Sequence, residues 1–377
     1  MLLAGSVSIQ RSSVSSAGEE ADHASDRPSL SRSGRFVAFE STATNLVAGD
    51  TNSSTDVFVR DHEAQTTQRV SVGRTGNEAN GASRNPSISG NGRYVAFETD
   101  ASNAVRHDTD GKTDIVVRDR RRGTNTLVSV DPTGGPITDA AIHPVVSGNG
   151  RFVVFNVNKS FGNFCCVELG PYVRDLVNQT TTAMPTQGWL IWSQTTISDD
   201  GSRVAYGLVQ PPSDPGAEEA PFAVVVADVP SATVIATIDS GIVTATRYFD
   251  VALSGNGRKV AYVFVTNNVG TLSRYNLDHP GLHQILTGLG APSQTALSAD
   301  GQVIAMRIVD SGYRYVVTDP LGSTPQVVST NAIGTIASSV DGTDLSADGK
   351  WVAFATPDPN MVPGDTNGVS DAFIRSK

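Results

Sequence analysis

Acidic and amide side chains recur at one fixed spacing in three places along this 377-residue chain. The three segments are GDTNSSTDVFVRD (49–61), HDTDGKTDIVVRD (107–119) and GDTNGVSDAFIRS (364–376). All share the pattern Asp-x-Asp/Asn-x-x-x-Asp, formed by Asp50, Asn52 and Asp56, by Asp108, Asp110 and Asp114, and by Asp365, Asn367 and Asp371. Asp and Asn are common in turns for local reasons, but such polarity alone does not explain a spacing that is kept while the intervening residues change.

This spacing suits a hard cation. Calcium takes about six to eight oxygen ligands from carboxylates, amides, backbone carbonyls and water. Gly111 and Gly368 permit a tight turn, and an asparagine precedes each leading Asp by five residues, at Asn45, Asn103 and Asn360. We therefore expect up to three structural Ca²⁺ ions, with the asparagines either completing the ligand shell or capping the loop. Hydrogen-bonded turns without an ion are the alternative, and Mg²⁺ is a poorer candidate because it dehydrates reluctantly.

A longer repeat indicates which elements hold these segments. One phrase, typified by SISGNGRYVAFET (87–99), occurs seven times. Its turn glycines recur about every 52 residues, at Gly34, Gly92, Gly150, Gly201, Gly257, Gly301 and Gly349. A period of this length is typical of propeller blades or of other repeat arrays.

Each repeat reads as four strands. A short strand ends at the repeated Ser, a Gly-bearing turn reverses the chain, and an apolar strand such as RYVAF follows. The third strand comes after a variable loop, as in DVFVRD (56–61), and the fourth comes after the next turn, as in TTQRVSV (66–72). The sequence therefore predicts an all-β fold, a seven-bladed β-propeller with four-stranded antiparallel blades.

The two ends of the chain predict how the ring closes. The C-terminal segment DAFIRS (371–376) is a third strand with no fourth strand after it. Residues 6–14, SVSIQRSSV, precede the first repeat as TTQRVSV precedes the second. We expect this N-terminal strand to complete the last blade, residues 344–377, and so to make residues 1–377 one domain. Whether the true N-terminus lies upstream stays open.

The repeated Ser-x-Asp/Asn-Gly-Arg/Lys followed by Val-Ala-Phe resembles the TolB-like, WD-repeat-like β-propeller family over essentially the whole chain. The GDTN…DVFVRD phrase is similar to that of a bacterial, exported subset of this family. The resemblance implies the fold but specifies function poorly, because related propellers are binding platforms, periplasmic adaptors or accessory domains of serine peptidases. Calcium loops of other propellers resemble Asp-x-Asp-x-Asp-Gly-x-x-Asp, and this chain has Ala48, Arg106 and Pro363 where the leading Asp would stand.

Residues suited to ligand binding gather in the connections between blades, which we expect on the same face as the candidate calcium loops. One connection holds Trp189 and Trp192, the next holds Arg247 and Tyr248, and an earlier one holds His143. Aromatic side chains with an arginine on a rigid rim suit a protein or carbohydrate ligand. Packing between blades is the alternative, and it is at least as consistent with the sequence.

The composition of the chain limits the classes of molecule that it is expected to bind. The chain has 38 acidic and 28 basic residues, a net charge of −10, which argues against nucleic acid and anionic membranes as partners. No apolar run of about 18 residues is present, so we expect no membrane insertion. The basic run 118–122 is expected in a solvated turn.

Cys165 and Cys166 are adjacent, which rarely fits disulfide geometry, so we expect two free thiols, with a strained disulfide or a metal role left open.

Motifs for catalysis are absent from the sequence. There is no Gly-x-Ser-x-Gly elbow and no His-Glu-x-x-His zinc motif among the six histidines. We therefore expect a monomeric, non-enzymatic, calcium-binding scaffold that binds a protein or glycan in the periplasm or outside the cell, where free calcium is high. The alternative is a hydrolase or lyase with a site in the central channel, since propeller enzymes gather sparse residues from many blades.

Overall fold

The computed structural model describes residues 7–106, 108, 110–161, 164–191, 193–210, 219–244, 249–266, 269–309, 313–319, 325–331 and 333–377. Its regular elements in these ranges are all β-strands. No helix that is long and apolar enough to cross a bilayer occurs among the described residues.

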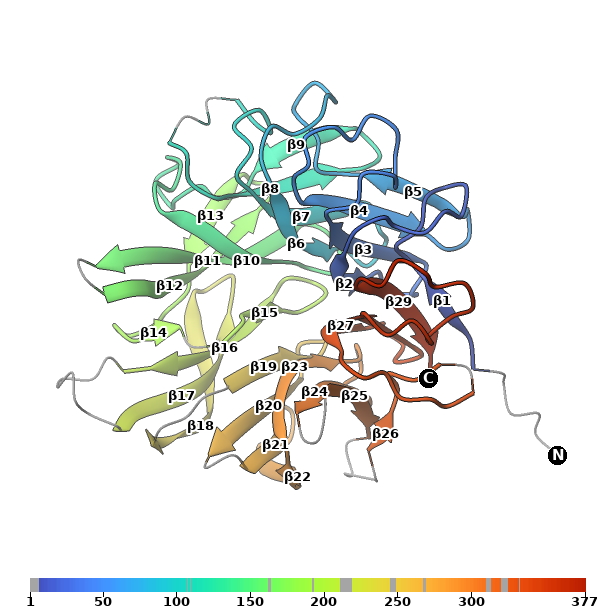
Figure 1. The fold of residues 1–377 in the computed structure, drawn as a ribbon. Coiled ribbons are helices and arrows are strands. Elements are labelled where there is room, and N and C mark those ends of the chain that lie inside the picture. The colour runs from blue at the N-terminus through green and yellow to red at the C-terminus, as the bar shows by residue number, and fades with distance from the viewer. Residues whose placement is uncertain are drawn as a thin grey trace.

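The described strands form seven antiparallel sheets, or blades, arranged in a ring (Figure 1). Blade 1 contains β2 (Ser25–Leu30), β3 (Phe36–Ser41), β4 (Asp56–Asp61) and β5 (Thr66–Arg69). Blade 2 contains β6 (Ser83–Ile88), β7 (Tyr94–Thr99), β8 (Asp114–Asp119) and β9 (Thr124–Leu127). Blade 3 contains β10 (Ala140–Val146), β11 (Phe152–Phe161), β12 (Phe164–Asp175) and β13 (Thr180–Ala183).

Blade 4 differs because its inner strand is divided. It contains β14 (Leu190–Ile191), β15 (Thr196–Ile197), β16 (Arg203–Val209), β17 (Glu219–Asp228) and β18 (Thr233–Thr244), and both β14 and β15 pair with β16. Blade 5 contains β19 (Phe249–Leu253), β20 (Lys259–Thr266), β21 (Val269–Asn276) and β22 (Leu282–Leu289). Blade 6 contains β23 (Ala291–Leu297), β24 (Ile304–Val309), β25 (Tyr313–Thr318) and β26 (Gln326–Val327).

Blade 7 closes the ring with strands from both ends of the chain. It contains β27 (Asp341–Leu345), β28 (Trp351–Thr356), β29 (Asp371–Ser376) and β1 (Ile9–Arg11). The N-terminal strand pairs antiparallel with β29, and Arg11 lies opposite Phe373. The predicted fold class and ring closure are confirmed, and the closing strand is shorter than the predicted range 6–14.

The repeated phrase builds the turn between the first two strands of each blade. In blade 1 the buried Ser31 accepts a hydrogen bond at Oγ from Phe36 N (2.9 Å), and its carbonyl accepts one from Gly34 N (2.9 Å). The turn glycine has a left-handed backbone, with φ of 71° at Gly92. A Cβ at Gly92 would lie 2.2 Å from the Phe36 ring of the preceding blade, so glycine is required by the turn and by packing between blades.

These turns also join the blades into a closed circle of backbone hydrogen bonds on one face, which we call the turn face. The N···O distances are 2.7–3.1 Å, and the bonds run from Arg32 N to Gly90 O, Gly90 N to Gly148 O, Asn149 N to Asp199 O, Asp199 N to Gly255 O, Asn256 N to Ala299 O, Ala299 N to Ala347 O and Ala347 N to Arg32 O. Within this circle the Arg32 guanidinium pairs with the Asp199 carboxylate across the channel. The channel is therefore obstructed at the turn face.

The apolar core consists mainly of the interfaces between neighbouring blades. One buried cluster joins Val57 and Val59 of blade 1 to Val95, Phe97 and Val116 of blade 2. A comparable cluster joins blade 7 to blade 1 through Phe39, Phe58 and Ile374. Each blade therefore buries its apolar surface only when its neighbours are present.

The side chain of His62, which follows β4, ties the closing strand to blade 1. Its ring nitrogens lie 3.0 Å from Gln10 Oε1 and 3.0 Å from Ser12 Oγ. A neutral ring can donate from one nitrogen and accept at the other. Burial, with a smaller contribution from Arg60, lowers the pKa of His62 from 6.5 to about 4.

We expect acidification to weaken this tie. Because the pKa of His62 is lower in the folded state, protons favour the unfolded chain, so the stability due to His62 falls as the pH falls from about 6.5 to about 4, by up to about 3 kcal/mol. Urea denaturation at stepwise pH measures this loss. His62→Gln should flatten that part of the profile, whereas the exposed His23→Gln should not; equal profiles for all three proteins would contradict the prediction.

Candidate functional site

The three Asp-rich loops lie between the second and third strands of blades 1, 2 and 7, beside the connections that enter the next blade. The last Asp of each loop begins a third strand, at Asp56, Asp114 and Asp371. In each case one carboxylate oxygen accepts a 2.5 Å hydrogen bond from a serine that follows the outer strand, from Ser71, Ser129 and Ser13 respectively. We call the face that carries these loops and connections the loop face.

In blade 1 the acidic cluster surrounds an arginine. Asp50, Asp56 and Glu78 have oxygens that lie within 4.8 Å of one another and could hold a metal ion. Arg69 Nη1 lies 3.4 Å from Asp50 Oδ1, 3.2 Å from Asp56 Oδ2 and 2.8 Å from Glu78 Oε1. Asn52 instead donates from Nδ2 to Ala79 O at 2.9 Å.

Blade 7 repeats this arrangement with residues from both ends of the chain. Glu20, Asp365 and Asp371 form the cluster, and Arg11 of β1 lies 2.9 Å, 3.2 Å and 3.5 Å from them in that order. Asn367 donates to Ala21 O at 2.9 Å and to Asp371 Oδ2 at 3.0 Å. In blades 1 and 7, therefore, a guanidinium stands among the carboxylates where we expected calcium.

Blade 2 has the carboxylates without the arginine. Asp108, Asp110 and Asp114 have oxygens within 4.8 Å of one another. Leu127 ends β9 at the position where Arg69 ends β5 and Arg11 ends β1. In the described part of the chain, no ion pair reaches this blade 2 cluster.

A second exchange separates blade 2 from the other two blades. Isolated β-bridges place Pro136 opposite Val130 as they place Glu78 opposite Val72. The third carboxylate of the blade 2 cluster is instead Asp110, at the position of Asn52 in blade 1. Blade 2 thus has neither the arginine nor the glutamate, and it has an aspartate within its own loop where blades 1 and 7 have asparagine.

Burial and hydrogen bonding shift the pKa values of the acidic groups in both clusters. Burial, followed by repulsion from Asp108 and Asp110, raises the pKa of Asp114 to about 6 against the opposing hydrogen bond from Ser129. Burial raises the pKa of Glu78, but hydrogen bonds from Thr51 and Arg69 outweigh it and the net pKa is about 2. Burial also raises the pKa of the equivalent Asp56 of blade 1 to about 6, although hydrogen bonding from Ser71 and the charge of Arg69 oppose the rise. The two blades therefore differ in the guanidinium that blade 1 has among its carboxylates, and not in the pKa of the aspartate that begins the third strand.

The three asparagines upstream of the loops make hydrogen bonds to the backbone and to carboxylates. Asn45 Nδ2 donates to Glu20 O at 2.7 Å, and Asn103 Nδ2 donates to Glu78 O at 2.9 Å. Asn360 Nδ2 donates to Asp358 Oδ1 at 3.1 Å. The first two therefore hold the connection that carries the glutamate of the preceding blade's cluster.

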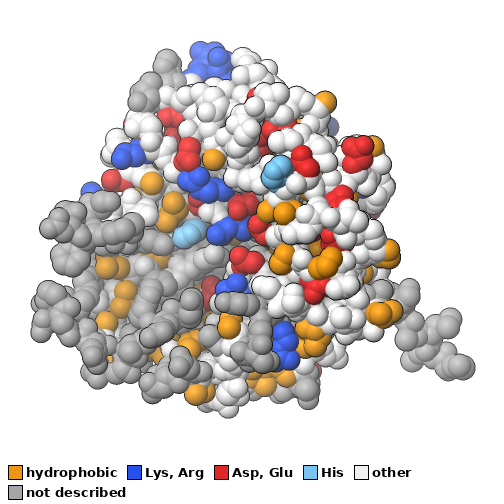
Figure 2. All heavy atoms as spheres, viewed as in Figure 1, with side chains coloured by type: hydrophobic (Ala, Val, Ile, Leu, Met, Phe, Trp, Pro, Cys, Tyr) orange, Lys and Arg blue, Asp and Glu red, His pale blue; other side chains and the backbone are white. Residues whose placement is uncertain are grey.

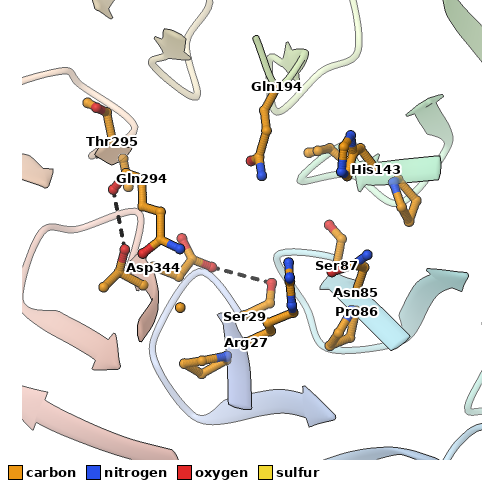
Figure 3. A pocket seen from close by; sticks show the side chains of 16 residues that line it. Arg27, Ser29, Asn85, Pro86, Ser87, His143, Gln194, Gln294, Thr295 and Asp344 are labelled. Atoms are coloured by element: carbon orange, nitrogen blue, oxygen red, sulfur yellow. Dashed lines mark hydrogen bonds between the residues drawn. The ribbon is translucent and has the colours of Figure 1, made fainter. Parts of the chain in front are cut away.

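The central channel opens at the loop face as a polar pocket of about 220 Å³. Its polar lining comes from the inner strands of six blades and includes Arg27, Asn85, His143, Gln194, Gln294 and Asp344. Figure 3 shows these side chains facing one another across the pocket. In Figure 2, acidic, basic and histidine side chains are seen around the centre of the ring.

β-Bulges orient several of these side chains. Register shifts interrupt the inner strands of blades 1, 2, 3, 6 and 7 beside the pocket. Four non-glycine residues there have left-handed backbones, with φ of 50° at Arg27, 51° at Asn85, 55° at His143 and 51° at Gln294. Such conformations cost energy and persist only when the surroundings hold them.

Hydrogen bonds between blades hold the bulges. Glu40 of blade 1 accepts from Asn85 N at 2.7 Å, and Glu98 of blade 2 accepts from His143 N at 2.8 Å. Asp344 of blade 7 accepts from Leu30 N at 2.7 Å. The pocket lining is thus a preorganised ring of side chains.

The residues predicted for ligand binding are not brought together as a group. His143 lines the channel pocket, whereas Trp189 is partly buried and packs against the apolar cluster between blades 3 and 4. Trp192, Arg247 and Tyr248 lie outside the described residues. Trp189 therefore packs between blades, which was the alternative to ligand binding.

Two further sequence observations can be placed in the fold. Cys165 and Cys166 occur in one strand, β12. The basic run 118–122 begins in β8, where Arg118 is buried, and continues into the turn between β8 and β9, where Arg120 stacks on the Phe36 ring at 4.9 Å. These two arginines are thus part of the packing.

Sequence reasoning missed Arg11, Arg69, Glu20 and Glu78, and it missed most of the channel lining. Signals for both were present. Gln-Arg recurs in SIQRSSV and TTQRVSV but not in TNTLVSV. In blades 1–3 a polar residue followed by proline stands four positions ahead of the repeated Ser, in RPSLS, NPSIS and HPVVS. No histidine, cysteine, aspartate or glutamate cluster of metal-binding geometry lines the channel among the described residues.

Comparison with protein families finds no match for this chain. Comparison with curated proteins also finds none. Among solved structures, an oligogalacturonate lyase in complex with manganese is similar with a TM-score of 0.59 and 12% identity, over 98% of this chain and 96% of that chain. The β-propeller domain of the Trilobed protease from Pyrococcus furiosus has a TM-score of 0.58 and 9% identity, over 93% of this chain and 95% of that chain.

TolB from Acinetobacter baumannii has a TM-score of 0.45 and 14% identity, over 91% of this chain and 80% of that chain, which is too weak to carry an argument. The solved structures have different functions, and their low identity shows the fold alone. The chain is thus a seven-bladed all-β propeller with acidic clusters that could hold a metal ion.

We expect Arg69→Leu to destabilise the protein by about 3 kcal/mol near neutral pH, because it leaves buried carboxylates without their cation. Urea denaturation in the presence of a chelator measures this loss. Arg69→Lys should lose less because it keeps the charge, and the exposed Arg121→Leu should stay within about 0.5 kcal/mol of the wild type. An unchanged stability of Arg69→Leu would show that the guanidinium does not hold the cluster.

Proposed function

We propose that this protein is a non-enzymatic, calcium-binding propeller that binds a protein or carbohydrate ligand at the channel mouth on its loop face. The observation that carries the proposal is the pocket of about 220 Å³ whose polar lining is held by β-bulges. The Arg32–Asp199 pair obstructs the opposite end of the channel, so the mouth has the form of a cup.

The calcium part of the proposal rests on blade 2 alone. Two equivalent blades have a positive guanidinium among their three carboxylates, and the blade 2 cluster, within the described ranges, has none. Two ligands on opposite sides of a calcium ion are about 5 Å apart, since each bond is about 2.3–2.6 Å. The 4.8 Å limit on the spacing of the Asp108, Asp110 and Asp114 oxygens fits that ion. The ion would neutralise the charges of Asp108 and Asp110, whose repulsion adds to burial in raising the pKa of Asp114.

A thermal melt of chelator-stripped protein tests the calcium site. Addition of millimolar calcium should raise Tm by about 2–5 °C, since binding at a hundred times Kd is worth about 2.7 kcal/mol. Asp108→Ala should abolish the rise, and magnesium should reproduce little of it. The matched variant Asp50→Ala should keep the full rise, because its cluster holds Arg69. A calcium response that survives Asp108→Ala would refute the blade 2 site.

The chemistry of the mouth suits hydroxyl groups or peptide groups. Carboxamides at Asn85, Gln194 and Gln294 can both donate and accept, Arg27 donates, and a neutral His143 can do either. A ligand that meets several such groups in a preorganised ring loses little affinity to ordering of the protein.

Defined oligosaccharides and short peptides, screened as immobilised panels and then measured by calorimetry, test the ligand site. A true ligand should bind at least tenfold more weakly to Asn85→Ala and to Gln194→Ala, and it should be recovered chemically intact. Arg121→Ala on the turn face is the control and should bind normally. If neither variant at the channel mouth weakens binding, the ligand binds at another site.

A hydrolase or lyase with a channel site is the second candidate. It is favoured by His143 and by the half-buried Asp344, whose pKa desolvation raises to about 6, at one pocket. Turnover of a panel oligosaccharide that is lost in His143→Gln would establish it in place of simple binding.

The proposed setting follows from calcium. Extracellular calcium modules bind the ion with Kd of about 10⁻⁴–10⁻³ M, so we place the protein in the periplasm or outside the cell, where free calcium is high enough to fill such a site. We also propose that it is a monomer. Fractionation of cells together with light scattering of the purified protein tests both statements.

A further inference from the structure

A second hollow opens on the loop face, away from the channel, where blade 1 meets blade 2. Its volume is about 440 Å³, and its lining consists of Arg74, Thr75, Asn77, Asn103, Val105 and Arg106. The first three residues belong to the connection between β5 and β6, and the last three belong to the loop between β7 and β8. The two arginines thus reach one hollow from two different segments.

Neither arginine is paired with an acidic side chain among the described residues. Within the described residues, Arg74 and Arg106 are exposed, and their guanidinium groups make no ion pair and no side-chain hydrogen bond. Other arginines of blades 1 and 2 are paired, such as Arg35 with Asp61 at 2.8 Å and Arg93 with Asp119 at 2.7 Å. Two unmatched guanidiniums at one hollow stand out in a chain with a net charge of −10.

The fold does not require arginine at these two positions. At the junction of blades 7 and 1, the equivalent residues are Ser16 and Ala48. The bridge Val14–Glu20 matches the bridge Val72–Glu78, which fixes the alignment of the two connections. The positive charges are therefore a property of this junction, and the general architecture of the repeat does not explain them.

The floor of the hollow is rigid. Arg74 N donates to Asn103 O at 2.9 Å, so the two segments are joined directly beneath the arginines. Asn103 Nδ2 donates to Glu78 O at 2.9 Å, and Asn77 Oδ1 accepts from Thr75 Oγ1 at 2.6 Å. A Cβ at Gly73 would lie 2.5 Å from Asn77 Oδ1 and 3.1 Å from Asn103 Nδ2, so these two side chains pack closely against Gly73.

We propose that this hollow is an oxyanion site, in which Arg74 and Arg106 together hold a sulfate, phosphate or carboxylate group of a ligand. The planar guanidinium presents paired N–H donors that match two oxygens of such a group. Two guanidiniums favour a doubly charged sulfate or phosphate over a carboxylate. The site is separate from the channel mouth and does not depend on the calcium proposal.

Titration of arginine side-chain N–H signals by ¹H–¹⁵N NMR tests the site, with sodium sulfate replacing chloride at constant ionic strength and with a chelator present. The signals that disappear in Arg74→Ala and in Arg106→Ala identify the two guanidiniums. In the wild type both signals should shift along one saturable curve, and each single variant should weaken sulfate binding about tenfold, the value of one charge-assisted contact. In parallel titrations, phosphate should bind about as tightly as sulfate, and acetate should bind more weakly than sulfate.

The exposed Arg121→Ala on the turn face is the matched control and should leave the sulfate curve unchanged. Because Arg74 and Arg106 are exposed, their alanine variants should melt within about one degree of the wild type, so loss of binding cannot be ascribed to unfolding. Shifts that do not saturate, or a sulfate affinity that both single variants leave unchanged at the remaining guanidinium, would overturn the proposal.

Discussion

The structure depends above all on closure of the ring. A single four-stranded blade has two faces, and both become buried only when neighbours pack against them, as in the cluster that joins Val57 and Val59 to Val95 and Phe97. Closure is supplied by β1 on the last blade and by the circle of backbone bonds on the turn face. Because each blade packs against both of its neighbours, its apolar surface is fully buried, and stabilises the fold fully, only in the complete ring. His62 adds a polar tie at the point where the two chain ends meet.

Burial of carboxylates at the rim sets a second constraint. Three acidic side chains in one small volume repel one another, and a cation is the direct remedy. Arg69 and Arg11 provide that cation in blades 1 and 7, and each also links its outer strand to the loop and to the following connection. In blade 2 the arginine and the glutamate are replaced by Leu127 and Pro136, while Asp110 adds a carboxylate. The same position in the repeat therefore has three carboxylates with an arginine in two blades and three carboxylates without one in a third blade.

The two faces of the ring differ for a related reason. On the turn face, small residues at Gly90, Gly148 and Gly255 let neighbouring backbones approach closely, and the Arg32–Asp199 pair crosses the channel. On the loop face, bulges turn long polar side chains toward the channel, and carboxylates of the preceding blades stabilise the backbone of those bulges. The polar pocket and the acidic loops therefore lie on the same face, where loops can vary without disturbing the blades.

The sequence by itself determined the repeat, the seven blades, the closing strand and the grouping of Asp50, Asp108 and Asp365 with their neighbours, because these features depend on local periodicity and on spacing within one loop. It could not identify Arg69 or Glu78 as partners of Asp50, since the three residues come from the outer strand, the next connection and the loop, and only packing brings those segments together. The same limit applied to the channel, where Arg27, Asn85 and Gln294 meet from blades far apart in sequence. Tertiary structure decided which acidic cluster lacks a cation and which side chains share a pocket, because both depend on distances between segments that the order of residues does not encode locally.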